Sequence, residues 1–435
     1  MVRIGLMARE KLGLNRRELI AGLGAAALTP TWSATGAAQA GPILDLRIRA
    51  DRLALRPGAP DTPVLSLGEA NMRFNRGDKV ELAFDPNLRN GMARLRGMDD
   101  DGSATQQDSA RPSKRATQMV LRQAGTFLCD LGLFPNDQGW PTRARPLIVR
   151  ESEPVTVDRD ETLLIEEWRV RADGTAIPPG AAPDETAVFY TLNGKPSLDV
   201  SARSNERLRL RFINGSQRTI IAVKLESVEV RVMAIDSQPA EPFAARNGAL
   251  VLAPGGRVDA FVDVAAPPGS NLKILLHEGK EIRTIGFVIV SRDPPARPTP
   301  LPPPPPLPSN GLPARLDLKS ALRVDLALDG PDWIVPTSSG ASSAPAFRAK
   351  AGRVVVLALT NRAAIATVFH LHGHHFRLLD RLDDGWKPFW LDTLAIEPGQ
   401  TQRIAFRAEY PGGNLIEAVA TEWAAPRLVR RYAVE

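Results

Sequence analysis

The chain consists mainly of short runs in which apolar and polar residues alternate, separated by turns rich in Pro, Gly, Asn and Asp. Alternation with a period of two residues predicts β-strands that bury one face. Few segments show the 3.6-residue period of an amphipathic helix over any length. We therefore predict an all-β fold.

Three of these runs resemble one another, since each has a turn, an alternating strand and then an asparagine. Measured from Gly77, Asn205 and Gly352, the units begin 128 and 147 residues apart, which is the size of a β-sandwich domain. The asparagines that follow them are Asn87, Asn214 and Asn361. The sequence thus predicts three β-sandwich domains, at residues 41–155, 156–292 and 311–435.

Residues 293–310 form a proline-rich linker between the second and third predicted domains. Ten of the sixteen residues from Asp293 to Pro308 are proline. Such a segment adopts polyproline II geometry, at about 3 Å per residue, and can cross a domain face as a semi-rigid spacer. Docking of a proline-binding partner is the alternative, and we favour the spacer.

Residues 1–40 carry a predicted export signal. The pair Arg16-Arg17 precedes a short apolar segment from Leu19 to Leu28, and Ala38-Gln39-Ala40 provides a small-residue cleavage site. The paired arginines favour the twin-arginine route, so we expect a periplasmic protein. A membrane anchor would need about 20 apolar residues, and we expect no membrane span in the mature chain.

The net charge predicts little about partners. Half of the formal charge of +6 comes from residues 1–40, whose five basic and two acidic side chains contribute +3. The remainder is too mild to predict nucleic-acid binding. We interpret basic runs such as Ser204–Arg211 as the polar face of a strand.

Four of the five histidines lie within residues 370–375 of an alternating run. His370 and His372 point to the same face of the predicted strand, and imidazoles at that spacing are well placed to bind copper or zinc. Outside this run the chain has only His277, and its sole cysteine is Cys129. A lone cysteine forms no intrachain disulfide, and we expect Cys129 to be buried as a small apolar side chain.

Several motifs make the whole chain after residue 40 resemble the three-domain multicopper oxidases. They are residues 369–374 (Phe-His-Leu-His-Gly-His), Asp392-Thr393 with Pro398-Gly399, residues 192–196 (Leu-Asn-Gly-Lys-Pro) and residues 253–257 (Ala-Pro-Gly-Gly-Arg). The resemblance implies three cupredoxin-like Greek-key β-sandwich domains.

Most positions that hold copper ligands in that family carry other residues here. The resemblance matches only His370 and His372 to ligands, both of the trinuclear cluster. The other ligand positions correspond to Arg94, Arg96, Asp130, Gly132, Thr367, Glu417, Ala418, Val419, Trp423 and Leu428. Because the family's cluster lies between domains one and three, we expect Arg94, Arg96, Asp130 and Glu417 to meet there in a buried ion network. In the alternative, some of these side chains face solvent.

The resemblance includes a copper-free branch of twin-arginine-exported periplasmic proteins. We therefore predict a non-catalytic scaffold that binds a protein of the cell envelope or division machinery, with no cofactor and no small-molecule substrate. The alternative is a protein, with or without oxidoreductase activity, that binds one copper or zinc ion through His370 and His372 with Glu417 or Asp130. A small-molecule site in the emptied cleft is a third possibility.

The histidines also have ordinary structural interpretations. His370 and His372 are expected as hydrogen-bonded core residues, His374 as a donor at a strand end, and His277 and His375 as surface or turn residues.

Overall fold

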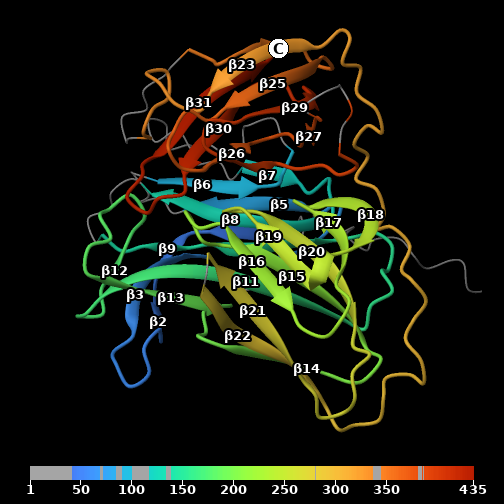
Figure 1. The fold of residues 1–435 in the computed structure, drawn as a ribbon. Helices are drawn as coiled ribbons and strands as arrows, with labels where there is room; N and C mark the ends of the chain where they lie inside the picture. The colour runs from blue at the N-terminus through green and yellow to red at the C-terminus, as the bar shows by residue number, and fades with distance from the viewer. Residues whose placement is uncertain are drawn as a thin grey trace, which may run out of the picture. The chain divides into compact units, whose positions relative to one another are not determined.

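A computed structural model describes residues 42–68, 72–84, 91–99, 117–133, 139–279, 281–336, 344–380, 385 and 387–435 (Figure 1). This part of the chain contains β-strands and a single 3₁₀ turn, Arg246–Gly248, and no α-helix. The all-β prediction is confirmed. The predicted export signal lies outside the described residues.

Residues 43–150 form three small sheets with the strand orders β1-β5-β7, β2-β3-β9 and β4-β10-β8-β6. Their strands are β1 (Ile43–Leu46), β2 (Ile48–Leu53), β3 (Thr62–Leu67), β4 (Met72–Asn75), β5 (Lys79–Phe84), β6 (Gly91–Arg96), β7 (Thr117–Val120), β8 (Gly125–Leu133), β9 (Thr142–Arg143) and β10 (Arg145–Arg150).

Residues 159–290 form two larger sheets, β12-β11-β15-β20-β17-β18, with β13 also paired to β11, and β14-β22-β21-β16-β19. Their strands are β11 (Arg159–Arg171), β12 (Ala176–Ile177), β13 (Thr186–Leu192), β14 (Leu198–Ala202), β15 (Arg207–Asn214), β16 (Ile221–Leu225), β17 (Arg231–Ile235), β18 (Gln238–Ala244), β19 (Ala249–Leu252), β20 (Arg257–Asp263), β21 (Asn271–Glu278) and β22 (Glu281–Val290).

Residues 322–434 form the sheets β23-β25-β29-β27 and β24-β31-β30-β26-β28. Their strands are β23 (Leu322–Ala327), β24 (Arg348–Ala349), β25 (Val354–Thr360), β26 (Thr367–Leu371), β27 (Arg377–Leu378), β28 (Thr393–Ile396), β29 (Thr401–Arg407), β30 (Gly412–Ala420) and β31 (Arg427–Val434).

The three repeated runs of the sequence occupy equivalent places in these sheets. β5 pairs in parallel with β1 and antiparallel with β7. β15 makes the same two kinds of pair with β11 and β20, and β25 makes them with β23 and β29. Each group of strands encloses its own apolar core, of which Leu82, Leu210 and Leu357 are members. The exact limits of the three domains stay a prediction, because residues 41–435 form one compact unit.

The proline-rich segment runs along the second group of strands and returns to the first. Arg207 Nη2 donates to the carbonyl oxygen of Pro302 at 2.8 Å, and Asn205 Nδ2 donates to that of Arg297 at 2.9 Å. Beyond the prolines, Asn310 exchanges two hydrogen bonds with the backbone of Ala124, at 2.9 and 2.8 Å. These contacts fit the predicted spacer.

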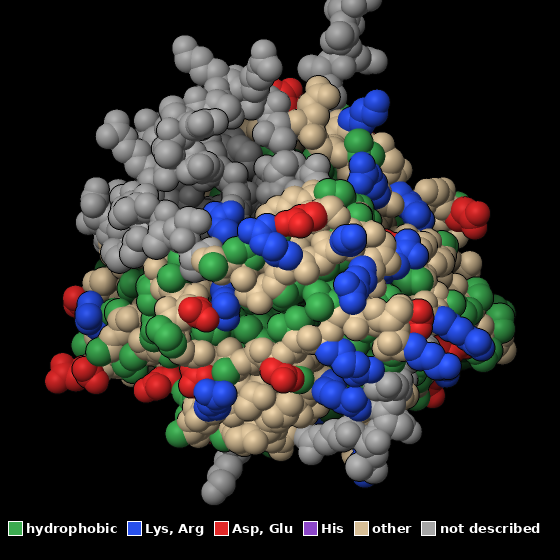
Figure 2. Space-filling view, turned by 90° about the horizontal axis from the view of Figure 1, so that it is seen from above, with side chains coloured by type: hydrophobic (Ala, Val, Ile, Leu, Met, Phe, Trp, Pro, Cys, Tyr) green, Lys and Arg blue, Asp and Glu red, His purple; other side chains and the backbone are tan. Residues whose placement is uncertain are grey.

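Figure 2 shows one face of the molecule, on which lysine and arginine side chains lie among hydrophobic and polar ones. None of the helical structure in the described residues is long and apolar enough to cross a membrane.

Candidate functional site: a buried network of arginines and carboxylates

Two pairs of strands from opposite ends of the chain bring the predicted charged residues together. Arg94 on β6 lies opposite Asp130 on β8 in the strand register, and Arg96 lies two residues further along the same face. Glu417 on β30 lies opposite His370 on β26. In Figure 1, β26 and β30 are drawn next to β6.

The guanidinium groups of Arg94 and Arg96 bridge the two carboxylates. Arg94 donates from Nε to Asp130 Oδ1 at 2.6 Å and from Nη1 to Glu417 Oε1 at 2.7 Å. Arg96 donates from Nε to Asp130 Oδ2 at 3.0 Å and from Nη2 to Glu417 Oε2 at 3.1 Å. All four residues are buried. The ion network predicted from the sequence is therefore present, and the alternative of solvent-facing side chains is wrong.

A third arginine, which sequence reasoning missed, completes the coordination of Glu417. Arg427, the first residue of β31, donates from Nη1 to Glu417 Oε2 at 2.8 Å. Burial and the charge of Arg94 lower the pKa of Arg427 to about 10, and burial and the charge of Arg427 lower that of Arg218 to about 9. The positive charge of the arginines around Asp130 and Glu417 thus exceeds the negative charge of these two carboxylates.

Both carboxylates are ionised in this environment. Burial opposes ionisation of Asp130, but the charges of Arg94 and Arg96 outweigh it and hold the pKa of this carboxyl well below its usual range. For Glu417, burial is likewise outweighed, by Arg94, Arg427 and Arg96, so the pKa again falls well below its usual range.

His370 is held in one tautomer by its neighbours. Thr393 Oγ1 donates to Asp392 Oδ1 at 2.6 Å, so the same hydroxyl accepts from His370 Nδ1 at 2.8 Å. The proton therefore lies on Nδ1, and the lone pair lies on the buried Nε2 atom, which has no hydrogen-bond partner among the described residues. Burial and the charges of Arg96 and His372 lower the pKa of His370 well below its usual value, which keeps the ring neutral.

His372 lies beside His370 and close to the ion network. The two rings meet edge to face with centroids 4.3 Å apart, and His372 Nε2 lies 3.2 Å from Glu417 Oε1. Burial lowers the pKa of His372, although Glu417 opposes this shift. A cavity of about 20 Å³ opens beside His370, Glu417 and Arg96, which is room for one water-sized group.

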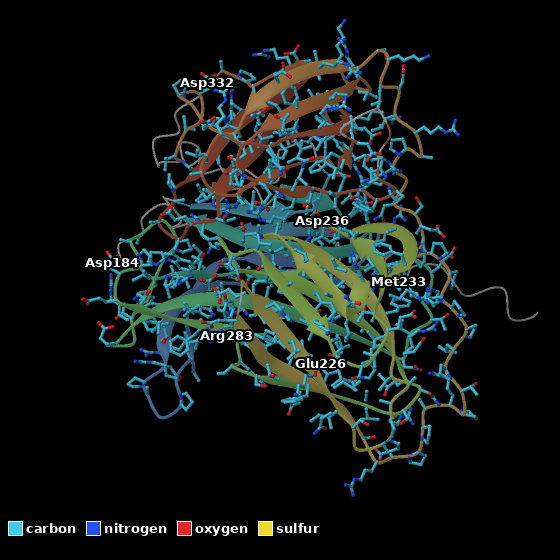
Figure 3. The ribbon with its side chains drawn as sticks, viewed as in Figure 1. Asp184, Glu226, Met233, Asp236, Arg283 and Asp332 are labelled. Atoms are coloured by element: carbon cyan, nitrogen blue, oxygen red, sulfur yellow. The ribbon has the colours of Figure 1, made fainter. Side chains whose placement is uncertain are left out.

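A second buried network, also missed by sequence reasoning, joins all three groups of strands. Arg257 donates to Asp392 from Nη1 at 3.0 Å and from Nη2 at 2.5 Å, and it donates from Nε to the carbonyl oxygen of Thr126 at 3.2 Å. Asp236 Oδ1 accepts from the backbone N–H of Arg257 at 3.1 Å. Burial and the charge of Asp392 raise the pKa of Asp236 to about 6. Figure 3 shows Asp236 between the strands drawn in orange and those drawn in yellow-green.

A glycine permits this close approach. Gly97, which follows β6, has a φ of +88°, and a Cβ atom there would lie 2.3 Å from Arg257 Nη2. Any larger residue at this position would therefore displace the guanidinium that binds Asp392.

His375 belongs to the second network, so the prediction of a surface or turn residue is wrong. The chain turns at Gly373, which has a φ of +81°, and His375 then points into the protein. Its Nδ1 lies 2.8 Å from Asp99 Oδ1, and its Nε2 lies 2.7 Å from the carbonyl oxygen of Asp236. Burial lowers its pKa, but the charge of Asp99 and its hydrogen bond outweigh burial and raise the pKa to about 8.

His374 has a structural role. His374 Nε2 accepts from the backbone N–H of Glu409 at 3.0 Å, so Nδ1 donates to the Tyr432 hydroxyl at 2.7 Å, as expected for a donor at a strand end. Burial lowers its pKa to about 4. His277 is half-buried near the end of β21, so it does not lie in a turn.

The remaining positions matched to copper ligands carry side chains without metal-binding groups, apart from the weakly coordinating hydroxyl of Thr367. Thr367 is buried and donates to Asn361 Oδ1 at 3.2 Å. Ala418 lies in the apolar core of the third group of strands, and Leu428 packs against that core. Val419 is buried, and Trp423 packs against the guanidinium of Arg169, 5.5 Å from the ring centroid. Gly132 pairs with Met92 in the register of β8 and β6.

Cys129 is completely buried in the core of the first group of strands, as predicted. Burial and the charge of Asp130 raise the pKa of its thiol, which disfavours the thiolate that copper requires.

The arginines of residues 204–211 lie on one face of β15, but this face is buried rather than exposed. Arg209 pairs with Asp259 at 2.6 Å and with Glu151 at 2.7 Å. Arg211 pairs with Asp160 at 2.5 Å and also contacts Asp259, at 2.9 Å. Residues of the first part of the chain cover this face, since Arg211 donates to Thr126 Oγ1 at 2.7 Å and Arg209 donates to Glu151 Oε2 at 3.0 Å.

These residues do not fit type 1 copper or a trinuclear cluster. Within the described ranges, no three or more His, Cys, Asp or Glu side chains are grouped so as to hold a metal ion. Arg94 and Arg96 occupy the carboxylates next to His370 and His372, and two cations at this place raise the cost of adding a third. The cavity beside His370 is also too small for several metal ions.

Comparison with known proteins shows similarity to multicopper oxidases over parts of the chain. The family model described as "Multicopper oxidase" matches residues 316–435. The chain is 23% identical over 256 residues to the multicopper oxidase MmcO of Mycobacterium tuberculosis, covering 54% of this chain and 48% of MmcO. It is 25% identical over 147 residues to Laccase-14 of Oryza sativa subsp. japonica, covering 31% of this chain and 25% of that protein. The chain therefore spans about half or less of these relatives.

Solved structures share the fold. A multi-copper oxidase of Pseudomonas thermotolerans matches with a TM-score of 0.72 at 22% identity, covering 91% of this chain and 100% of the other. McoA of Aquifex aeolicus matches with a TM-score of 0.68 at 14% identity, covering 90% and 98%. These likenesses show the cupredoxin-like fold, and residues 316–435 match the multicopper oxidase family model.

Proposed function

We propose that this protein is a non-catalytic member of the multicopper oxidase family, exported to the periplasm, where it is a scaffold that binds an envelope protein such as a component of the division machinery. The supporting observation is the bridge from Arg94 and Arg96 to Asp130 and Glu417. Four charge-assisted hydrogen bonds join β6 and β8 to β30 where the family holds its cluster, so the two ends of the chain are linked without metal.

The residues at the other ligand positions support the absence of oxidase activity. Electrons enter a multicopper oxidase through a type 1 copper bound by a thiolate, and the matching positions here hold Thr367, Ala418 and Leu428. An alanine cannot supply the thiolate, and Cys129 is buried in another core. We therefore expect no oxidation of phenols and no reduction of oxygen.

Two edge strands offer a surface for a protein partner. β18 and β19 each lie at the end of a sheet. Phe243 on β18 is 42% exposed, and Val251 on β19 is 71% exposed. An open strand edge with exposed apolar side chains suits the addition of an extended segment from a partner.

The metal content of the mature protein tests the non-catalytic part of the proposal. The protein is purified from the periplasm without chelators, its copper and zinc are measured by mass spectrometry, and a copper-loaded sample is assayed for phenol oxidation. We expect copper far below one equivalent and no oxidation. Stoichiometric copper with turnover of a phenol would refute the proposal.

Site-specific crosslinking in cells tests the partner surface. A photo-crosslinking residue at Val251 should give a discrete crosslinked product, and Phe243→Asp should decrease its yield. The same residue at Arg348, an exposed position in the third group of strands, is the control. Equal products at Val251 and Arg348, or no effect of Phe243→Asp, would argue against this surface.

A mononuclear metal site is the second candidate, because the lone pair of His370 Nε2 is buried without a partner and the ring is neutral. The Asp392–Thr393–His370 chain orients this ring as a metal ligand needs. Titration with zinc or copper distinguishes the two functions. Binding of one equivalent that is lost in His370→Ala and kept in His277→Ala would replace the scaffold proposal with a metal-binding one.

A further inference from the structure

A separate cavity of about 210 Å³ lies where β4 and β10 of the first group of strands meet β11 of the second. It shares no lining residue with the cavity beside His370. Its lining residues are Met72, Arg73, Arg143, Arg145, Pro146, Ile148, Glu161, Thr162, Leu164 and Asn193. The lining thus combines apolar side chains with three arginines.

The apolar wall comes from the contact between two sheets. Leu164 on β11 packs with Ala144, Leu128 and Ile213 in a small buried cluster between the groups of strands. Ile148 on β10 is 2% exposed and lies opposite Arg73 in the strand register. This surface is rigid, because its residues belong to strands of both groups. It offers a place for the apolar part of a ligand.

Two of the guanidinium groups are fixed by contacts behind the cavity. Arg143 donates from Nη2 to Glu166 Oε2 at 3.1 Å and from Nη1 to Asp51 Oδ2 at 3.3 Å. Arg145 donates from Nε to the carbonyl oxygen of Leu67 at 3.1 Å and from Nη2 to the same Asp51 oxygen at 3.4 Å. Because both guanidinium groups are already held in place, binding of an anion would cost little side-chain conformational entropy.

The third guanidinium, that of Arg73, makes only long contacts. Its Nη2 donates to the carbonyl oxygen of Asp160 at 3.3 Å and lies 3.4 Å from Thr162 Oγ1, and its Nη1 lies 3.8 Å from Asp160 Oδ2. The carboxylate of Asp160 is already bound by Arg211 at 2.5 and 2.7 Å. The long contacts leave Arg73 able to turn toward a ligand without losing a strong hydrogen bond.

The charges around the cavity do not balance. The lining holds three arginines and one carboxylate, Glu161, which pairs with Arg159. Asp51 and Glu166 bind Arg143 and Arg145, and Asp160 lies near Arg73, but these three carboxylates are not lining residues. Burial and the charge of Arg143 lower the pKa of Arg145, whereas for Arg143 burial is outweighed by Glu166 and Asp51, which together raise the pKa. A bound anion would supply the missing negative charge.

We propose that this cavity binds a small organic anion, either a carboxylate or a phosphate monoester with a compact apolar part. The anionic group lies among Arg73, Arg143 and Arg145, and the apolar part lies against Ile148 and Leu164. The volume is below the roughly 300–1,000 Å³ of sites for drug-sized molecules, so the ligand is smaller than these. This site is independent of the scaffold function and of any metal.

Calorimetric titration of the whole mature protein tests the proposal with four probes: phenyl phosphate, benzoate, inorganic phosphate and benzyl alcohol. At least one of the two aromatic anions should bind more tightly than inorganic phosphate, and benzyl alcohol should not bind. Arg73→Gln should weaken binding of that anion by about tenfold or more, as expected for the loss of a charge-assisted hydrogen bond. Arg73→Lys should keep part of the affinity. Arg231→Gln is the matched control, because its side chain is 29% exposed against 28% for Arg73.

A second variant tests the cavity without removing charge. Thr162→Met places a longer side chain in the space, so it should abolish binding while circular dichroism shows an unchanged fold. Failure of both aromatic anions to bind the wild-type protein would overturn the proposal, as would equal affinity in wild type and Arg73→Gln. Equal binding of phosphate and phenyl phosphate would overturn the organic class of ligand.

Discussion

Arg94 Nη1 donates to Glu417 Oε1 at 2.7 Å, although the two residues are 323 positions apart in the sequence. The same arginine binds Asp130 through Nε, so one planar guanidinium joins a β6–β8 strand pair to β30. A contact of this kind cannot form until both ends of the chain have folded and met. It therefore stabilises the assembled arrangement rather than either group of strands alone.

Arg96→Ala should lower the free energy of unfolding by about 3–5 kcal/mol, because it leaves Asp130 and Glu417 buried with one partner fewer. Denaturant unfolding followed by tryptophan fluorescence measures the change. Arg348→Ala removes an arginine that is 61% exposed and should have little effect. An unfolding midpoint of Arg96→Ala equal to that of the wild-type protein would show that the network does not stabilise the fold.

Glu417→Gln should destabilise the protein more than Asp130→Asn. Glu417 accepts from Arg94, Arg96 and Arg427, and only 1% of its side chain is exposed. Asp130 accepts from two arginines, and 11% of its side chain is exposed, so solvent can compensate part of its loss. Parallel thermal unfolding of the two variants gives the order. The reverse order would mean that Asp130 balances more of the positive charge of these arginines than Glu417 does.

Stability should decrease between about pH 6.5 and 8 through deprotonation of His375. Its pKa is raised from 6.5 to about 8, so its contribution is complete below pH 6.5 and is lost as the pH rises through the folded value. A shift of this size corresponds to about 2 kcal/mol. Asp236, with a pKa near 6, titrates below this window.

The pH dependence of unfolding in His375→Gln tests this assignment. The variant should lose the decrease above pH 6.5, whereas His277→Gln should keep it. A decrease of the same size in His375→Gln would assign the titration to another group.

The sequence predicted the strands and the first network because both depend on features that a sequence shows. Alternation marked the strands, and the positions of Arg94, Arg96, Asp130 and Glu417 followed from their match to ligand positions of a known family. The unlike charges at these positions then predicted that the side chains would pair once the fold brought them together.

The second network could not be predicted in the same way. Arg257 and Asp392 are 135 residues apart, and neither replaces a ligand. Whether the polar face of a strand meets solvent or another sheet depends on how the groups of strands pack. The alternation of apolar and polar residues gives no information about this packing. The same limit applies to Arg209 and Arg211, whose face of β15 is buried. Arg427 was missed because its partner, Glu417, already had two predicted arginines.

The repeated asparagines provide the last test, because the structure gives two of them the same role. Asn361 Nδ2 donates to the carbonyl oxygens of Ile365 and Ile396, both at 2.8 Å. Asn214 Nδ2 donates to those of Thr219 and Leu252, at 2.9 and 3.0 Å. Each amide thus ties the end of its strand to a following loop and to a neighbouring strand. The third asparagine of the repeat, Asn87, lies outside the described residues.

Asn214→Ala and Asn361→Ala should each lower the free energy of unfolding by about 2–4 kcal/mol, because both leave two backbone carbonyl groups without their donor. Asn271→Ala, at an exposed position of β21, should change it by less than about 0.5 kcal/mol. Denaturant unfolding compares the three variants. Similar losses of stability in Asn214→Ala and Asn361→Ala would confirm that the repeated asparagines stabilise the fold to the same extent. A large loss at only one of them would show that the other amide is replaceable by water, and that the sequence repeat records shared ancestry rather than shared stabilisation.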